Sequence, residues 1–181
     1  TYSGDLISST SGTSNFRAGV NAGNSIQSGG NYNVVVGDEA GTALTTGDNN
    51  TALGYQAGDA LTTPFGNVAI GDRALSAETT GQRNTAVGST ALFAQNNTGN
   101  ELVYNTAVGY QAGSAITTGI QNTILGALAG DALTTGKEQI AIGYEALSAE
   151  TNGIASTAVG YQALKAQNGS GAINVYNVAA V

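Results

Sequence analysis

Short hydrophobic triplets recur along the chain, and each one ends on a glycine. In Val68-Ala69-Ile70 and Ile140-Ala141-Ile142 the larger aliphatic side chains stand at positions i and i+2, with an alanine between them. Such alternation is typical of a β-strand, in which successive side chains point to opposite faces. The triplets therefore predict very short strands. The glycine after each one predicts a bend that needs a positive φ or a close backbone approach.

These glycines lie at nearly constant spacing. A 17-residue period separates consecutive members of the series, except for one 21-residue step before Gly109: Gly37, Gly54, Gly71, Gly88, Gly109, Gly126, Gly143 and Gly160. A helical-hairpin repeat needs a period of about 33 or more, whereas a 17-residue period fits one coil of a β-solenoid with two short strands and two bends. The spacing predicts an all-β, parallel β-solenoid (β-roll) of about nine coils.

A longer repeat lies above the coil. The segment 33–104 aligns without gaps on 105–176, with identity at 42 of 72 positions, and the fourth coil of each unit is a lengthened, 21-residue coil. The predicted organisation is an N-terminal arm or junction segment at 1–15, a degenerate first coil at 16–32, two four-coil units at 33–104 and 105–176, and the start of an incomplete coil at 177–181.

Two alanine positions follow each bend. The first is occupied by Ala40, Ala57, Ala74, Ala91, Ala112, Ala129, Ala146 and Ala163, and the second by Ala43, Ala60, Ala77, Ala94, Ala115, Ala132, Ala149 and Ala166. Columns of methyl groups indicate a close approach of other backbone. They are explained either by packing inside one chain or by a seam between chains, and their i, i+3 spacing also fits a helical turn.

Composition and charge argue against several classes of protein. Cys, His, Met and Trp are absent and 9% of residues are charged, so there is neither a disulfide framework nor a thiol site. The formal net charge of −7 opposes binding to nucleic acid and to anionic membranes. No apolar run reaches the roughly 18 residues that a membrane-spanning helix needs. We expect no nucleic acid partner and no membrane insertion.

Candidate catalytic chemistry is limited to carboxylates. Catalytic Ser-His-Asp and Cys-His sets cannot be built without His and Cys, which leaves a carboxylate pair of the kind that cleaves glycosides. The candidates are Asp59, Asp131, Glu78 and Glu150. They recur with the 72-residue unit, which favours solvated turn residues, so we expect no enzyme, no catalytic residue and no cofactor.

Other side chains were weighed for binding. Asp38, Asp48 and Asp72 adjoin glycines, but the Gly-Gly-x-Gly-x-Asp motif of calcium-binding solenoids is missing, and no metal site is expected. Tyrosines after the bend glycine could pack along a coil edge or stack on sugars or a partner; they are Tyr55, Tyr110, Tyr144 and Tyr161. The Thr-Thr-Gly bends are too irregular for an ice-binding ladder.

The unit Asn-Thr-Ala-Val-Gly-Tyr-Gln-Ala, at 105–112 and with Ser first at 156–163, resembles the head repeats of YadA-type trimeric autotransporter adhesins and similar repeats of phage tail fibres. The resemblance covers the segment 33–181. It implies a left-handed parallel β-roll in which three identical chains pack around one axis. The coils of this chain are longer than the usual coil of that family.

These observations predict a structural protein that forms a homo-oligomeric fibre, extracellular, on a cell surface or in a virion, and the resemblance implies that the oligomer is a trimer. End-to-end stacking of solenoids is one route to such a fibre, with the segment 1–15 completing the junction. The competing hypothesis is an adhesin or receptor-binding head that recognises a host glycan or surface protein. The four-residue insertions after Asn96 and Asn168 are the only breaks in the repeat, and they suit either hypothesis.

Overall fold

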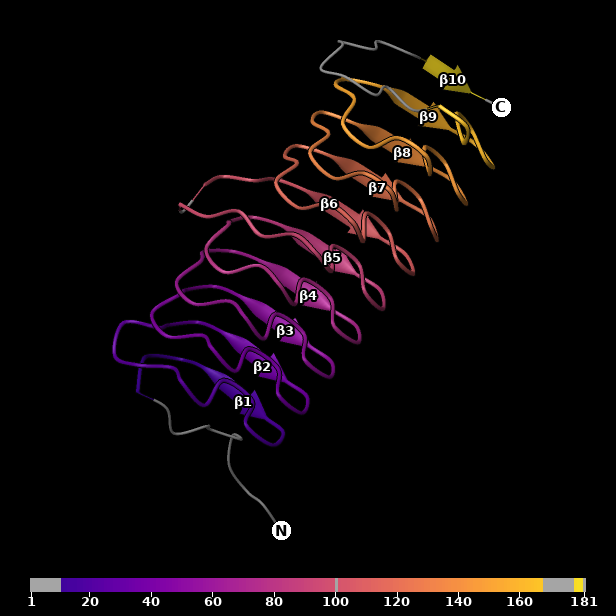
Figure 1. The fold of residues 1–181 in the computed structure, drawn as a ribbon. Coiled ribbons are helices and arrows are strands. Elements are labelled where there is room, and N and C mark those ends of the chain that lie inside the picture. The colour runs from indigo at the N-terminus through magenta and orange to yellow at the C-terminus, as the bar shows by residue number, and fades with distance from the viewer. Residues whose placement is uncertain (1–10, 100, 168–177, 181) are drawn as a thin grey trace.

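The computed structural model is an elongated β-solenoid whose coils stack along one axis (Figure 1). It describes residues 11–99, 101–167 and 178–180, the last three by their backbone. One parallel sheet contains all ten strands in chain order. The strands are β1 (Phe16–Ala18), β2 (Val34–Val36), β3 (Thr51–Leu53), β4 (Val68–Ile70), β5 (Thr85–Val87), β6 (Thr106–Val108), β7 (Thr123–Leu125), β8 (Ile140–Ile142), β9 (Thr157–Val159) and β10 (Val178–Ala180). The predicted parallel β-solenoid is confirmed.

Each triplet pairs with the same triplet of the next coil. The register is Val68 on Thr85 and Ala69 on Ala86, for example, and it passes through the long coil without a slip, with Thr85 on Thr106. In the first coil Phe16 pairs with Val34. Most of the arm and all of the second insertion lie outside the described residues, so the predicted roles of both stay predictions.

The predicted second strand of each coil is wrong. Outside the strands, the described residues form isolated bridges, Asp48 with Phe65, Gln82 with Leu102, and Lys137 with Ile154, and single backbone hydrogen bonds between coils, such as Gly41 N–H to the Ala57 carbonyl. The cause is frequent left-handed backbone. In the coil of β3, Gln56, Gly58 and Gly66 have φ of 51°, 55° and 71°, and each turns the chain out of the extended conformation that a longer strand would need.

From β2 to β9 the central residue of each triplet, an alanine except for Val35 and Ile124, points inward, and the flanking side chains point outward. Ala52, Ala69 and Ala86 are buried to 1% exposure or less, whereas Leu53 is 44% exposed. The first alanine column is equally buried, so it packs inside one chain. The second column is mostly half-buried. No α-helix occurs in the described part of the chain, which removes the helical alternative.

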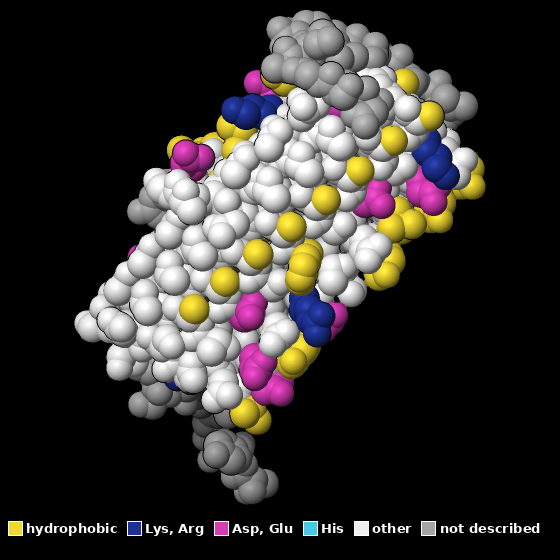
Figure 2. All heavy atoms as spheres, in the orientation of Figure 1, with side chains coloured by type: hydrophobic (Ala, Val, Ile, Leu, Met, Phe, Trp, Pro, Cys, Tyr) yellow, Lys and Arg dark blue, Asp and Glu magenta, His cyan; other side chains and the backbone are white. Residues whose placement is uncertain are grey.

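Hydrophobic side chains also lie on the surface. On the face shown in Figure 2 they form an evenly spaced row along the solenoid axis, surrounded by polar side chains and backbone. A side chain that repeats at one position of every coil produces this arrangement, because neighbouring strands of a sheet lie about 4.8 Å apart.

Two coil types fill the narrow interior in different ways. In one type a glycine at the fourth position after the bend is followed by a buried Leu or Ile, as with Gly58 and Leu61. A Cβ on Gly58 would lie 2.6 Å from Leu61 Cδ1, so the two side-chain positions compete for one space. In the other type a leucine such as Leu75 stands where the first type has the glycine. A longer polar side chain such as Glu78 then stands where the first type has the buried Leu or Ile. The 72-residue unit contains two coils of each type in succession.

The bend glycines are required at their positions. From Gly19 to Gly160 their φ lies between 127° and 141°, a region that L side chains rarely adopt. From Gly37 to Gly143, a Cβ would lie only 2.2–2.6 Å from the carbonyl oxygen of the next bend glycine. Both of the predicted reasons for a glycine here, positive φ and close backbone approach, are confirmed.

We expect Gly126→Ala to lower the free energy of unfolding by about 3 kcal/mol or more, because it combines backbone strain with a clash against a carbonyl group. Gly66→Ala is the matched control: its Cβ would meet only Arg83 Cγ, at 3.8 Å, and the same coil position holds Asn49 and Arg83 elsewhere. That change is expected to cost about 1 kcal/mol. Urea denaturation followed by circular dichroism measures both, and equal costs would contradict the analysis.

Candidate functional site: an exposed apolar sheet face

The four carboxylates considered for catalysis do not form a catalytic pair. Glu78 and Glu150 are completely buried, so the prediction that they are solvated turn residues is wrong. Asp59 and Asp131 are half-buried. No group of three or more His, Cys, Asp or Glu residues that could hold a metal ion occurs in the described residues.

An interior ladder of asparagines runs beside the sheet, one residue before each strand. The side-chain oxygen of Asn33 accepts the backbone N–H of Asn50 at 2.9 Å, and that of Asn50 accepts the N–H of Asn67 at 3.0 Å. Five of the asparagines also donate across the coil with their side-chain amide, as Asn33 Nδ2 does to the Gly47 carbonyl at 2.8 Å. The ladder continues through Asn84, Asn105, Asn122, Gln139 and Ser156.

The asparagine ladder satisfies polar groups that the narrow interior hides from water. Two members of the ladder, Asn84 and Gln139, are incompletely hydrogen-bonded, because their side-chain amide nitrogens are buried without a partner. Asn84 opens the long fourth coil, and Gln139 is one methylene longer than the asparagine usual at this position. The ladder is structural, because its members are enclosed within the coils.

Glu78 replaces the hydrogen bonds that the long coil cannot make. In a regular coil Thr62 donates its N–H to the Thr79 carbonyl of the next coil, at 2.9 Å. Before the long coil, Glu78 Oε1 accepts the N–H groups of Thr79, Thr80 and Gly81 at 2.9, 3.2 and 2.7 Å instead.

The same carboxylate is tied to the long coil itself. Gln95 Nε2 donates to Glu78 Oε2 at 3.0 Å, and the Asn97 N–H lies 3.2 Å from both oxygens. Glu150 repeats the inner part of this arrangement, accepting the Gly153 N–H at 2.9 Å. The two glutamates stand at equivalent positions of the two 72-residue units because each precedes a lengthened coil.

The ionised carboxylates of Asp59 and Asp131 are destabilised by their partial burial. Desolvation by burial raises the pKa of both carboxyl groups above the ordinary aspartate value, and one oxygen of each is buried without a hydrogen bond. The aspartates considered for calcium lie apart: Asp38 and Asp72 are exposed, and Asp48 accepts the backbone N–H of Asn31 at 2.6 Å.

The outward face of the sheet is the largest functional candidate. From β2 to β9 it presents two side chains per strand, of which eleven are aliphatic, five are threonine and none is charged. The third strand position forms an unbroken aliphatic row: Val36, Leu53, Ile70, Val87, Val108, Leu125, Ile142 and Val159. Leu125 and Leu53 are 46% and 44% exposed.

Exposed aromatic side chains extend this face at the bend. The four tyrosines that follow a bend glycine are 43% to 68% exposed. Tyr144 and Tyr161 stack on each other with ring centroids 5.6 Å apart, and the Arg73 guanidinium lies over the Tyr55 ring. At the other edge Arg83 contacts the rings of Phe65 and Tyr104. Large contiguous apolar surfaces of this kind mark interaction sites.

Comparison with known proteins gives no relative. No protein-family model, no curated protein and no solved structure matches the chain. A helix that could cross a membrane is not found among the residues that the structure describes.

Removing the Glu78 side chain should destabilise the solenoid strongly. Glu78→Ala leaves four backbone N–H groups without their acceptor, for an expected loss of about 4 kcal/mol in the free energy of unfolding. Glu78→Gln keeps a carbonyl oxygen and should lose about half as much. Urea denaturation distinguishes the two, and similar costs would show that the carboxylate is not the acceptor that matters.

Asp131→Asn should stabilise the protein at neutral pH. Because the folded-state pKa of Asp131 is raised, the folded state resists ionisation, and wild-type stability falls as pH rises from the ordinary aspartate pKa through the raised one. The variant avoids this penalty. Its melting temperature is expected to exceed that of the wild type at pH 7, with the difference shrinking below the ordinary aspartate pKa of 3.8.

Asp38→Asn serves as the control for this comparison, because Asp38 is exposed. A pH-independent gain in the Asp131 variant would contradict the desolvation explanation.

Proposed function

We propose that this chain is a structural segment of a homo-oligomeric fibre in which three copies pack through the exposed sheet face. The observation that carries the proposal is the uncharged outer face of β2 to β9, with its unbroken aliphatic row. A side chain that needs only to face water gains nothing from being Val, Leu or Ile at every coil, whereas burial of apolar surface stabilises by about 25 cal/mol per Å².

A second copy of the chain is the partner that fits this face best. The face is a ladder whose rungs follow the strand spacing of about 4.8 Å. Only a surface with the same spacing can contact the outward side chains of every strand in the same way, and another solenoid of this sequence has that spacing. Symmetric self-association is also the commonest form of assembly. The number of three chains rests on the resemblance to YadA-type heads and phage tail fibres.

The same resemblance supports a location outside the cell, on a cell surface or in a virion, and a role without turnover. Within this proposal the solenoids can also associate end to end. β1 and β10 are the outer strands of the sheet, and edge strands are templates for further pairing.

The double substitution Leu53→Glu with Leu125→Glu tests the assembly. The two residues are equivalent positions of the two units, and burying glutamate at a chain interface without a partner is strongly unfavourable. For the wild type, with a chain of 17.9 kDa, we expect a trimer mass of about 54 kDa by sedimentation equilibrium. The variant is expected at the monomer mass with an unchanged β-type circular dichroism spectrum.

The matched control is Thr63→Glu with Thr135→Glu, a pair at exposed bend positions of the same two units. It should leave the mass unchanged. A wild-type chain that is monomeric at micromolar concentration, or a face variant that keeps the wild-type mass, would overturn the proposal.

A further inference from the structure

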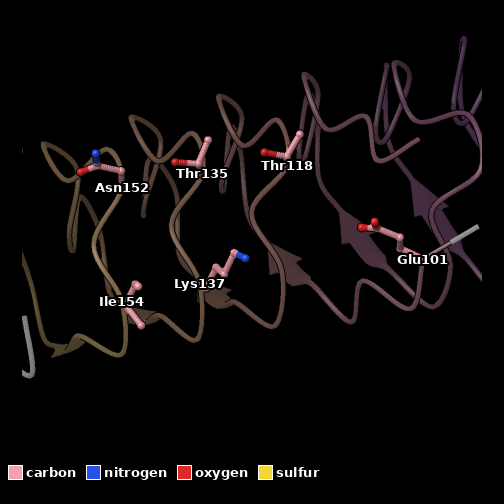
Figure 3. Close-up of a pocket in the computed structure, with 6 residues that line it drawn as sticks. All are labelled: Glu101, Thr118, Thr135, Lys137, Asn152 and Ile154. Atoms are coloured by element: carbon pink, nitrogen blue, oxygen red, sulfur yellow. The ribbon is translucent and has the colours of Figure 1, made fainter. Parts of the chain in front are cut away.

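An open groove lies beside the first four-residue insertion. It has a volume of about 460 Å³ and is lined by Glu101, Thr118, Thr135, Lys137, Asn152 and Ile154. Figure 3 shows Thr118, Thr135 and Asn152 in a row along one rim, Lys137 and Ile154 along the other, and Glu101 toward one end. We propose that this groove binds a short neutral oligosaccharide, an activity beyond the structural function above.

The rims are held in place by the solenoid. Thr118, Thr135 and Asn152 occupy the same position in three successive coils. Lys137 and Ile154 are joined by a parallel bridge, and Asn97 Nδ2 of the long coil donates to the Thr118 carbonyl at 3.4 Å. The groove therefore presents its polar groups at regular intervals along the axis on a rigid backbone.

The charged groups of the groove are available to a ligand. The single ion pair among the described residues joins Lys165 to Glu145, so the Lys137 ammonium and the Glu101 carboxylate have no ionic partner there. Opposite charges that line one groove without pairing can each form charge-assisted hydrogen bonds to a ligand. The exposed Thr118 and Thr135 add two hydroxyl groups, each both a donor and an acceptor.

A neutral sugar matches this set of groups. Its hydroxyl groups can donate to Glu101 and accept from Lys137, and they can do both with the threonines and Asn152. The aliphatic surface of Ile154 suits the apolar C–H face of a sugar ring. A polyanionic glycan fits less well, because Glu101 and the net charge of −7 oppose it.

The groove does not simply follow from the coil repeat. In the first unit the residues equivalent to Thr135 and Lys137 are Thr63 and Phe65. The coil that precedes β2 has no insertion to supply a counterpart of Glu101. The threonine rim is thus common to both units, whereas a lysine at this position occurs only in the second unit, where Glu101 from the insertion at the end of the first unit also lines the groove.

Saturation-transfer difference NMR on the full chain tests the proposal. The probes are maltotriose, cellotriose, mannotriose and chitotriose, with trigalacturonate as the anionic comparison. At least one neutral trisaccharide is expected to bind saturably with a dissociation constant on the order of 1 mM. Thr135→Val and Glu101→Gln should each weaken that binding at least fivefold, and Thr63→Val, the equivalent change in the first unit, should leave it unchanged.

Three results would overturn the inference: no saturable signal from any neutral probe at about 20 mM, well above the expected dissociation constant; binding that survives both groove substitutions; or tighter binding of trigalacturonate. Sedimentation of each variant checks the oligomeric state separately, so failure of the sugar site and failure of the proposed assembly are distinguishable.

Discussion

In-register stacking of like positions is the constraint on which the whole structure depends. Each coil hydrogen-bonds to the next through a parallel sheet, so every residue lies above its counterpart, and a side chain acceptable once must be acceptable in a column. At the bend this leaves room for no side chain at all, since a Cβ on Gly88 would lie 2.3 Å from the Gly109 oxygen. Inside, it favours methyl groups and hydrogen-bonded amides.

The lengthened fourth coil is accommodated without a change of register. The sheet and the asparagine ladder run through it, with the Asn105 N–H on Asn84 Oδ1 at 3.1 Å. The segment between the alanine columns and the next strand absorbs the difference, and there Glu78 supplies acceptors that the next coil supplies elsewhere. A buried carboxylate is costly unless it is hydrogen-bonded. Five donors surround this one.

Much of the fold could be predicted from the sequence because period and alternation express the stacking directly. The strand positions and the bend glycines follow from them, whereas the alanine columns that contain Ala57 and Ala60 were equally compatible with interior packing, a seam between chains or a helical turn. The absent second strand could not be predicted, since the left-handed residues that break it include Arg73 and Leu128, which carry no turn signal. Which face of the triplet is inward was equally open, because alternation alone does not say whether small or large residues face the core.

The site was predictable only in part. The tyrosine edge follows from the repeated Tyr after the bend glycine. The roles of Glu78 and Glu150 were missed, although their recurrence just before each long coil was a usable signal. The asparagine ladder also had a usable sequence signal, namely the asparagine that precedes most strands. The groove joins residues 101 and 154, which the sequence places three coils apart, and only the three-dimensional stacking brings them to one surface.

The central claim is that the aliphatic outer face is covered by another copy of the chain. The most direct test is methyl NMR of the wild-type protein with a soluble paramagnetic gadolinium chelate, which broadens resonances in proportion to their exposure. The account predicts that the methyl groups of Leu53 and Leu125 are protected, although each is nearly half exposed in the single chain, while those of Val20, 69% exposed, broaden strongly. Equal broadening of Leu125 and Val20 would contradict it.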